Sequence, residues 1–361
     1  MENRVIQHGL MKTFHFCTSL ALGGIPKLLA LIGSLNSHLE EQYNLWVLCE
    51  DDYTKDVLTS FNLQNVFLEN LGLVEDKYPA LLEVKTKRDA FEYNCTLRPA
   101  WIHYVLDTSD AIHHVTYLDT DLYFFSDPSS IYEDLDQNSV LLSPHRLSRL
   151  ALFMGVSEKT VGSFNAGWVV FKNDLDARRV LEWWHLRCIE WCFRKPEAGR
   201  FGEQKYLDGF FNISTKVGVV RHKGVNLAPW NMNDHRISVN KANQVLIDDD
   251  VLIFFHFHAL KVQGERSFKV EKELGTETLQ LTNPSYVVSD SIRTLIYEPY
   301  LKELRSSVKD LEEKGVNVST AVKHSEFPRK IRIRARSRLV NVFAIIALKF
   351  LDLLNVLRSR P

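Results

Sequence analysis

The sequence has few cysteines, and their arrangement excludes two common kinds of cross-link. Its 361 residues include 5 cysteines, an odd number, and most of them lie within apolar segments. Their spacing is that of neither a zinc site nor a disulfide framework. Cys188 and Cys192, four residues apart in an expected helix, are interpreted as thiols of the core. The cysteine content therefore indicates a reducing compartment.

Long apolar runs are also missing. The N-terminus has no apolar stretch of the length that a signal peptide needs, and no other segment suits an ordinary membrane-spanning helix. The composition, with 45% hydrophobic and 25% charged residues, is ordinary for a soluble protein. The formal net charge of -1 conceals a strongly basic C-terminal segment. We expect most of the chain to stay in the cytoplasm.

Short β-rich segments alternate with helical patterns through the first half of the chain. This alternation predicts an α/β fold in which helices cover both faces of a mostly parallel central sheet. Expected strands occupy residues 14–18, 45–49, 65–68, 114–119, 139–143, 168–171, 217–221, 237–240 and 251–258, and expected helices occupy residues 26–39, 52–61, 86–106, 174–193 and 292–313.

Two carboxylates close the most informative of these strands. The segment YLDTD at residues 117–121 contains Asp119 and Asp121, and ligands of open α/β sheets bind outside the carboxyl ends of the strands. Residues i and i+2 of an extended chain point to the same side, so both carboxylates can reach one Mg²⁺ or Mn²⁺ ion. An isolated Asp-x-Asp also marks solvated turns. At the end of a buried strand, however, two carboxylates lose hydration and need a cation or hydrogen-bond donors.

Four segments, in the same order, resemble GT-A glycosyltransferases, especially family 8 and related bacterial nucleotide-sugar transferases. They are YLDTD at 117–121, FNAGWVVF at 164–171, GEQKYL at 202–207 and FHFHALK at 255–261. They resemble, respectively, the D-x-D, F-N-A-G, D-Q-x-x-L and late H-x-x-G…K elements of that family. The resemblance implies a GT-A fold that transfers a sugar from a nucleotide diphosphate donor with Mn²⁺ or Mg²⁺ as cofactor.

The resemblance also divides the chain. It implies a GT-A catalytic domain over residues 1–284, with a nucleotide-binding half at about 12–160 and an acceptor half at about 161–284. Residues 285–327 are expected to form a C-terminal helical extension, and residues 328–361 a separate basic segment.

On the donor side, the resemblance makes Asp119 and Asp121 metal ligands and a late histidine the third. His256 is the first choice and His258 the rival, and a histidine satisfied within the core is the alternative for each. By the resemblance, an arginine approaches the donor phosphates and a lysine contacts the diphosphate. In this chain the lysine follows the late histidine segment at a spacing one residue shorter than is usual in the family. The residues that it places near the donor are Cys17, Thr18, Arg98, Asp119, Thr120, Asp121 and Lys261.

Near the transferred sugar, the resemblance places Asn165, Glu203 and Gln204, with Asp208 as a further candidate. Asn165 offers a side-chain amide that can bind a sugar hydroxyl, and the two small residues after it allow a close approach of the backbone. The alternative is that these residues only form a tight turn before a strand. Glu203 replaces the aspartate that is usual in the family, and Ala259 stands where glycine is common. The resemblance implies retention of the anomeric configuration, with the donor phosphate helping to deprotonate the acceptor.

Residues 328–361 have a pattern of their own, in which arginines crowd the first part and apolar residues the second. The polar positions of the apolar part are Asn341, Lys349, Asp352 and Asn355. These positions fall on one stripe of a helix, which predicts a helix lying in an anionic membrane surface. Nucleic acid is not an expected partner, because aromatic residues are not interleaved. A helix packed on the catalytic domain or on a second copy of the chain is the alternative.

The sequence thus predicts a glycosyltransferase at the inner face of the plasma membrane, acting on a glycan or glycolipid in cell-envelope polysaccharide or lipopolysaccharide synthesis. Two alternatives stay open. Haloacid dehalogenase phosphatases also place Asp-x-Asp after a strand, but they normally continue with Thr or Val, where this chain has Leu122 and Tyr123. A membrane-recruited scaffold without turnover is the other alternative, because the loop at residues 20–24 departs from the family.

Overall fold

The computed structural model describes residues 13–153, 155–258, 260 and 288–317, together with the backbone of 270–273 and 276–279. The chain divides into two compact units, Met1–His324 and Ser325–Pro361, and all described residues lie in the first. The predicted amphipathic helix and Lys261 therefore lie outside the described residues. Within the described part, no helix has both the length and the apolar character that crossing a bilayer requires.

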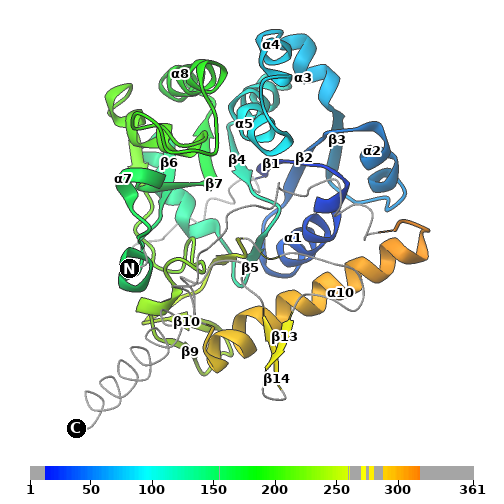
Figure 1. The fold of residues 1–361 in the computed structure, drawn as a ribbon, viewed down its shortest axis with the longest axis vertical. Helices are drawn as coiled ribbons and strands as arrows, with labels where there is room; N and C mark the ends of the chain where they lie inside the picture. Colours follow the sequence, from blue (N-terminus) through cyan, green and yellow to red (C-terminus); the bar gives the residue numbers. More distant parts are fainter. Residues whose placement is uncertain are drawn as a thin grey trace, which may run out of the picture. The chain divides into compact units, whose positions relative to one another are not determined.

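A sheet of seven strands forms the centre of the first unit (Figure 1). Its strands are β1 (Phe14–Leu20), β2 (Tyr43–Cys49), β3 (Val66–Asn70), β4 (His114–Leu118), β6 (Val140–Pro144), β7 (Phe164–Lys172) and β8 (Val217–Val219). In space they follow the order β3-β2-β1-β4-β7-β6-β8. Neighbouring strands pair in parallel except at β7, which is antiparallel to both β4 and β6. The predicted mostly parallel central sheet is confirmed.

Helices cover both faces of this sheet. They are α1 (Ile25–His38), α2 (Asp52–Thr59), α3 (Leu71–Lys77), α4 (Ala80–Lys85), α5 (Ala90–Leu106), α8 (Leu175–Glu190) and α10 (Glu298–Glu313). Side chains alternate between the faces along a strand. On β4, Leu118 belongs to the core shared with α1, α2 and α10, whereas Val115 and Tyr117 belong to the core shared with α3, α4, α5 and α8. Figure 1 shows α1 and α10 together on the side of the sheet opposite α5 and α8.

Acidic side chains fix where several helices begin. Asp51, Asp89 and Asp174 precede α2, α5 and α8, and each accepts a hydrogen bond from a backbone N–H of the first turn. Asp89 also forms a reciprocal capping box with Glu92. The helix expected over residues 86–106 therefore begins only at Ala90. The short helices α3 and α4, which the sequence pattern does not predict, are held by burial of a few apolar side chains in the same core.

The second half of the unit adds small sheets that are separate from the central one. β5 (Leu122–Phe124) pairs antiparallel with β12 (Phe254–His256). The remaining paired strands are β9 (Ile237–Val239), β10 (Val245–Ile247) and β11 (Asp250–Val251), and then β13 (Val270–Glu273) with β14 (Thr276–Leu279). The short helices are α6 (Arg149–Phe153) and α7 (Glu158–Val161), with 3₁₀ segments at Leu22–Gly24, Ser129–Asp136, Gln204–Asn212 and Met232–Asp234.

The C-terminal helical segment is part of the main core. α9 (Asp290–Ile292) continues through a π-helical turn at Arg293–Tyr297 into α10, which packs along α1 (Figure 1). Apolar side chains of α10, such as Leu304 and Val308, are buried in the same cluster as those of β1 and α1. The helix predicted at residues 292–313 is confirmed, and its apolar stripe faces the sheet domain.

Candidate active site

Three strands place two acidic residues and a histidine side by side. Asp119 follows β4, and Asp121 directly precedes β5. The antiparallel pairing of β5 with β12 puts His256 opposite Leu122. The backbone N–H of Phe257 also donates to the carbonyl oxygen of Asp121 at 2.8 Å. The three-residue strand β5 thus joins the acidic motif to the late histidine.

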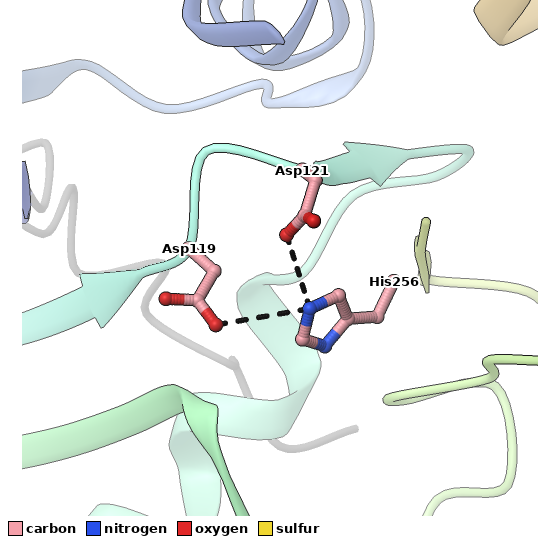
Figure 2. A group of neighbouring side chains, drawn as sticks. All are labelled: Asp119, Asp121 and His256. Carbon is pink, nitrogen blue, oxygen red and sulfur yellow. Dashed lines mark ion pairs between the residues drawn. The ribbon is translucent and has the colours of Figure 1, made fainter. Parts of the chain in front are cut away.

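The side chains of these residues converge on one point (Figure 2). His256 Nε2 lies 3.0 Å from Asp121 Oδ1 and 3.7 Å from Asp119 Oδ2. One ligand atom from each of the three lies within 4.8 Å of the others, which is close enough for a shared metal ion. His258, the other candidate histidine, is exposed, and its ring centroid lies 6.0 Å from that of His256. It does not belong to the three-residue group.

Gly167 in β7 makes room for this convergence. A Cβ atom at this position would lie 2.6 Å from Asp119 Oδ2 and 2.6 Å from His256 Cε1. The same residue accepts a hydrogen bond at its carbonyl oxygen from the N–H of Asp119, at 2.8 Å. The backbone of β7 therefore lies directly against the carboxylates and the imidazole, and only glycine fits there.

A chain of side-chain amides sets the orientation of the imidazole. His256 Nδ1 lies 3.2 Å from Asn165 Oδ1, which also accepts from the N–H of Gly167. Asn165 Nδ2 donates to Gln204 Oε1 at 3.0 Å, and Gln204 Nε2 donates to the carbonyl oxygen of Val161 at 2.9 Å. Because Asn165 presents its oxygen, Nδ1 of His256 is the donor in this contact, and Nε2 is directed at the two carboxylates.

These side chains fit a divalent ion such as Mn²⁺ or Mg²⁺. Carboxylate oxygens suit such ions, and a neutral imidazole whose other nitrogen is hydrogen-bonded completes the set. Burial alone raises the pKa of Asp121, but the neighbouring Lys27 and His256 outweigh burial and hold that pKa well below its usual range. Asp121 is therefore ionised at neutral pH, as a metal ligand has to be.

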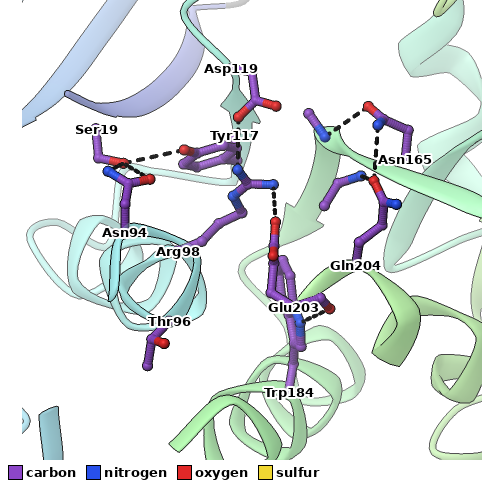
Figure 3. A network of polar contacts seen from close by, with 12 residues as sticks. Ser19, Asn94, Thr96, Arg98, Tyr117, Asp119, Asn165, Trp184, Glu203 and Gln204 are labelled. Carbon is purple, nitrogen blue, oxygen red and sulfur yellow. Dashed lines mark hydrogen bonds and ion pairs between the residues drawn. The ribbon is translucent and has the colours of Figure 1, made fainter. Parts of the chain in front are cut away.

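Arg98 of α5 lies between the two halves of the domain (Figure 3). One terminal nitrogen contacts Asp119 Oδ1 at 2.8 Å, and the other contacts Glu203 Oε1 at 2.9 Å. The guanidinium also lies over the ring of Tyr117, 4.4 Å from its centroid. Arg98 is only 6% exposed. The structure thus places Arg98 and Glu203 in one buried ion pair, whereas the resemblance puts the first near the donor phosphates and the second near the sugar.

Polar side chains also gather near the carboxyl end of β1, where Figure 3 shows Ser19 with Asn94 and Tyr117. The hydroxyl of Ser19 lies 3.2 Å from that of Tyr117 and accepts from Asn94 Nδ2 at 3.2 Å. Asn94 also donates to the carboxylate of Glu50, which directly follows β2. Burial raises the pKa of Glu50, and the hydrogen bond from Asn94 lowers it in part. Sequence reasoning missed Glu50 and Asn94, although the position of Glu50 at a strand end is a usable signal.

The remaining predicted residues lie around this centre. Cys17 and Thr18 are fully buried within β1, so their side chains belong to the core. Thr120 separates the two acids and is half-buried. Asp208 accepts from the N–H of Ser163 at 2.8 Å and pairs with Lys205, next to the turn that leads into β7. Sequence reasoning also missed a cation at the acidic pair, Lys27 of α1, whose Nζ lies 3.4 Å from Asp121 Oδ2.

Comparison with solved structures defines the class of fold. The galactosyltransferase LgtC, solved in complex with donor and acceptor sugar analogues, matches 83% of this chain and 100% of its own, with a TM-score of 0.51 and 14% sequence identity. The predicted GT-A type of fold is thereby confirmed. No model of a known protein family matches the sequence.

Closer similarity in sequence is found to two proteins of Bacillus subtilis (strain 168). The uncharacterized protein YfnF is 32% identical over 277 residues, which are 76% of this chain and 90% of YfnF. The uncharacterized protein YfnD is 31% identical over 304 residues, which are 84% of this chain and 92% of YfnD. The chain belongs to the same family as YfnF and YfnD.

Proposed function

We propose that the protein is a metal-dependent glycosyltransferase of the family 8 type, which moves a sugar from a nucleoside diphosphate to a glycan or glycolipid. The observation that carries this proposal is the convergence of Asp119, Asp121 and His256 at the carboxyl edge of the sheet, where open α/β sheets bind ligands. The fold adds support, because LgtC is a galactosyltransferase and its structure contains donor and acceptor sugar analogues.

In this proposal the two aspartates and His256 hold Mn²⁺ or Mg²⁺. The ion supplies positive charge next to the diphosphate that departs when the sugar–phosphate bond breaks. The chain contributes the geometry of the site. Asn165 fixes the imidazole with its Nε2 toward the carboxylates, and Gly167 lets the backbone of β7 approach them. Arg98 holds the second oxygen of Asp119, so this carboxylate presents one defined oxygen to the site.

The nucleoside of the donor lies, in this proposal, at the carboxyl ends of β1 and β2. Ser19, Glu50 and Asn94 are the polar side chains that line this edge, next to Tyr117. A carboxylate such as Glu50 accepts hydrogen bonds from ring N–H groups of a base or from ribose hydroxyls. Cys17 and Thr18, with buried side chains, support this edge from within β1.

The acceptor half leaves no candidate carboxylate free to act as a nucleophile among the residues that the structure describes. Glu203 is held by Arg98, and Asp208 is held by Lys205 and a backbone N–H. Gln204 is similarly engaged through both ends of its amide. These contacts support transfer with retention, in which an oxygen of the donor phosphate takes the proton of the acceptor hydroxyl. The new glycosidic bond forms on the sugar carbon as its bond to the phosphate oxygen breaks.

We place the reaction at the cytoplasmic face of the plasma membrane, in the synthesis of a cell-envelope glycan. The support is the sequence pattern of residues 328–361, whose arginines and apolar face suit an anionic lipid surface. Deletion of these residues is expected to move the protein from membrane pellets to the supernatant. Sedimentation that does not change on deletion would contradict the membrane assignment and leave the chemistry unaffected.

Donor hydrolysis is the most direct test of the chemistry. The purified protein is incubated with UDP-, GDP-, CDP-, ADP- and dTDP-sugars in Mn²⁺, Mg²⁺ or EDTA, and release of nucleoside diphosphate is measured. We expect turnover of one donor class that EDTA abolishes and that Asp121→Asn lowers by about 100-fold or more. Asp249→Asn is the matched control, because the Asp249 side chain is 96% exposed. If no donor is bound or turned over with any metal, the scaffold alternative replaces this proposal.

A further inference from the structure

The first turn of α1 carries a lysine at the acidic pair. Lys27 Nζ lies 3.4 Å from Asp121 Oδ2, and His256 Nε2 lies 3.0 Å from the other oxygen, Oδ1, of the same carboxylate. The Lys27 side chain is 19% exposed, so the ammonium is partly shielded from water. None of the four sequence segments that resemble the family contains Lys27, and the three proposed metal ligands do not include it.

A divalent ion at Asp121 changes the environment of this ammonium. The ion and Lys27 then share one carboxylate, and like charges a few ångströms apart repel each other strongly where water is scarce. A divalent ion at this site would already balance the two carboxylates of Asp119 and Asp121. The ammonium is then left with no net negative charge at its partner, and an anion that contacts both the ion and Lys27 removes this repulsion.

Among the residues that the structure describes, the other cation at the acidic pair cannot make this contact. Arg98 is buried, and both of its terminal nitrogens are occupied by Asp119 and Glu203. The helix that carries Lys27 favours an anion as well, because α1 has no acidic residue in its first turn and Gly24, its N-cap, offers no side-chain acceptor. The positive end of the helix dipole then adds to the lysine charge.

We propose that Lys27 binds the diphosphate of the donor and stabilises it as the leaving group. This inference rests on the proposed function and adds a residue to it. On binding, the ammonium moves from Asp121 to a phosphate oxygen. The charge of the departing diphosphate grows as the sugar carbon leaves its oxygen, so the contact strengthens along the reaction. Lys27 therefore contributes both to binding of the nucleotide and to the rate of transfer.

Lys27→Met distinguishes binding of the diphosphate from a role as a simple counter-ion of Asp121, because the two roles predict different changes in Mn²⁺ affinity and in nucleotide affinity. Mn²⁺ affinity of the protein without nucleotide is measured by electron paramagnetic resonance. It is expected to rise in the variant, since a competing cation is removed. Affinity for the tightest binder among UDP, GDP, CDP, ADP and dTDP, at saturating Mn²⁺, is measured by calorimetry and is expected to fall by about ten- to a hundred-fold.

Two controls test whether the effect is specific to Lys27 and to the phosphates. Lys302→Met removes a lysine from the exposed face of α10 and is expected to change neither affinity. The nucleoside of the same base, which has no phosphates, is expected to bind Lys27→Met and the natural protein equally. A parallel fall of Mn²⁺ and nucleotide affinity, or equal nucleotide affinity in both proteins, would overturn the role of Lys27 while leaving the proposed function intact. A natural protein that binds none of the diphosphates overturns both.

Discussion

His256 and Asn165 are joined by a hydrogen bond of 3.2 Å that links β12 to β7 at the acidic pair. It connects the imidazole, through Asn165 and Gln204, to the backbone carbonyl of Val161. The orientation of the imidazole toward the two carboxylates is thus set by a backbone carbonyl at the end of α7. If the proposed metal ion binds here, side chains oriented in this way would not need to reorganise.

Replacement of Asn165 by alanine tests this connection. The variant leaves Nδ1 of His256 without its acceptor, so the imidazole can rotate or change tautomer. We expect affinity for Mn²⁺ to fall by about ten- to a hundred-fold, measured by titration of the protein without nucleotide. Gln64→Ala is the control, because it removes an exposed amide that is distant from Asn165 in the sequence, and it is expected to bind Mn²⁺ normally. Unchanged Mn²⁺ affinity in Asn165→Ala would show that this hydrogen bond does not contribute to metal binding.

Gly167→Ala adds a single methyl group to the centre of the site. The new Cβ falls 2.6 Å from both Asp119 Oδ2 and His256 Cε1, and 2.8 Å from Asn165 Oδ1, so these groups have to move apart. We expect a loss of metal-stimulated donor hydrolysis and a decrease of about 1–3 kcal/mol in the free energy of unfolding.

The matched control for this substitution is Gly72→Ala. Gly72 lies in α3, and nothing lies within 4 Å of an added Cβ. Alanine there is expected to stabilise the protein slightly, by about 0.4–1 kcal/mol, because it lowers the entropy of the unfolded chain. Both free energies come from urea unfolding followed by circular dichroism. If Gly167→Ala were as stable as the control and kept its Mn²⁺ affinity, the close approach of β7 would be needed neither for stability nor for metal binding.

The acidic motif and the fold could be predicted from the sequence because both depend on local pattern. Asp119 and Asp121 follow an apolar strand, and the alternation of short strands and helices is sufficient to indicate a parallel sheet. His256 was found only through its resemblance to a family segment. Its contact with Asp121 depends on β5, a strand of three residues whose pairing with β12 leaves no periodic signal.

The residues that sequence reasoning missed come from elements that meet only in three dimensions. Lys27 occupies an ordinary position in the first turn of a helix, and nothing nearby in the chain distinguishes it from a surface lysine. Asn94 lies on α5, between residues that point into the core. For Arg98, the sequence suggested contact with phosphate, whereas the fold pairs its terminal nitrogens with two carboxylates that lie 84 positions apart in the sequence, Asp119 and Glu203. Such proximity follows from packing rather than from local sequence.

Arg98→Met is expected to destabilise the fold strongly. It leaves the carboxylates of Asp119 and Glu203 without their cation, and Glu203 is only 7% exposed. Removing one partner of a buried ion pair costs about 3–5 kcal/mol. Urea unfolding in EDTA measures this cost without the influence of bound metal. Arg149→Met, at a surface pair in which the arginine is 80% exposed, is expected to change stability by less than about 1 kcal/mol. Similar values for the two variants would contradict the buried bridge.

Glu50→Gln is expected to make the protein more stable at neutral pH. Burial raises the pKa of Glu50 above its ordinary 4.5, so the native state binds a proton more tightly than the unfolded chain does. The stability from this proton is fully present below the unfolded pKa and is lost as the pH rises through the folded pKa. Glutamine keeps an oxygen for Asn94 and cannot ionise. The free energy of unfolding of Glu50→Gln is therefore expected to exceed that of the natural protein near pH 7, and the difference should vanish well below pH 4.5.

The same variant tests why a destabilising carboxylate stands at the carboxyl end of β2. If Glu50 accepts hydrogen bonds from the donor nucleoside, Glu50→Gln should bind the nucleoside diphosphate less tightly at the pH at which it is more stable. Thermal unfolding across the pH range and calorimetry at about pH 7 measure the two effects. Glu40→Gln, at an exposed position, is the control for both. A gain in stability with unchanged nucleotide affinity would place the nucleoside elsewhere on the sheet edge. No gain at any pH would mean that the Asn94 hydrogen bond already offsets the burial of the carboxylate.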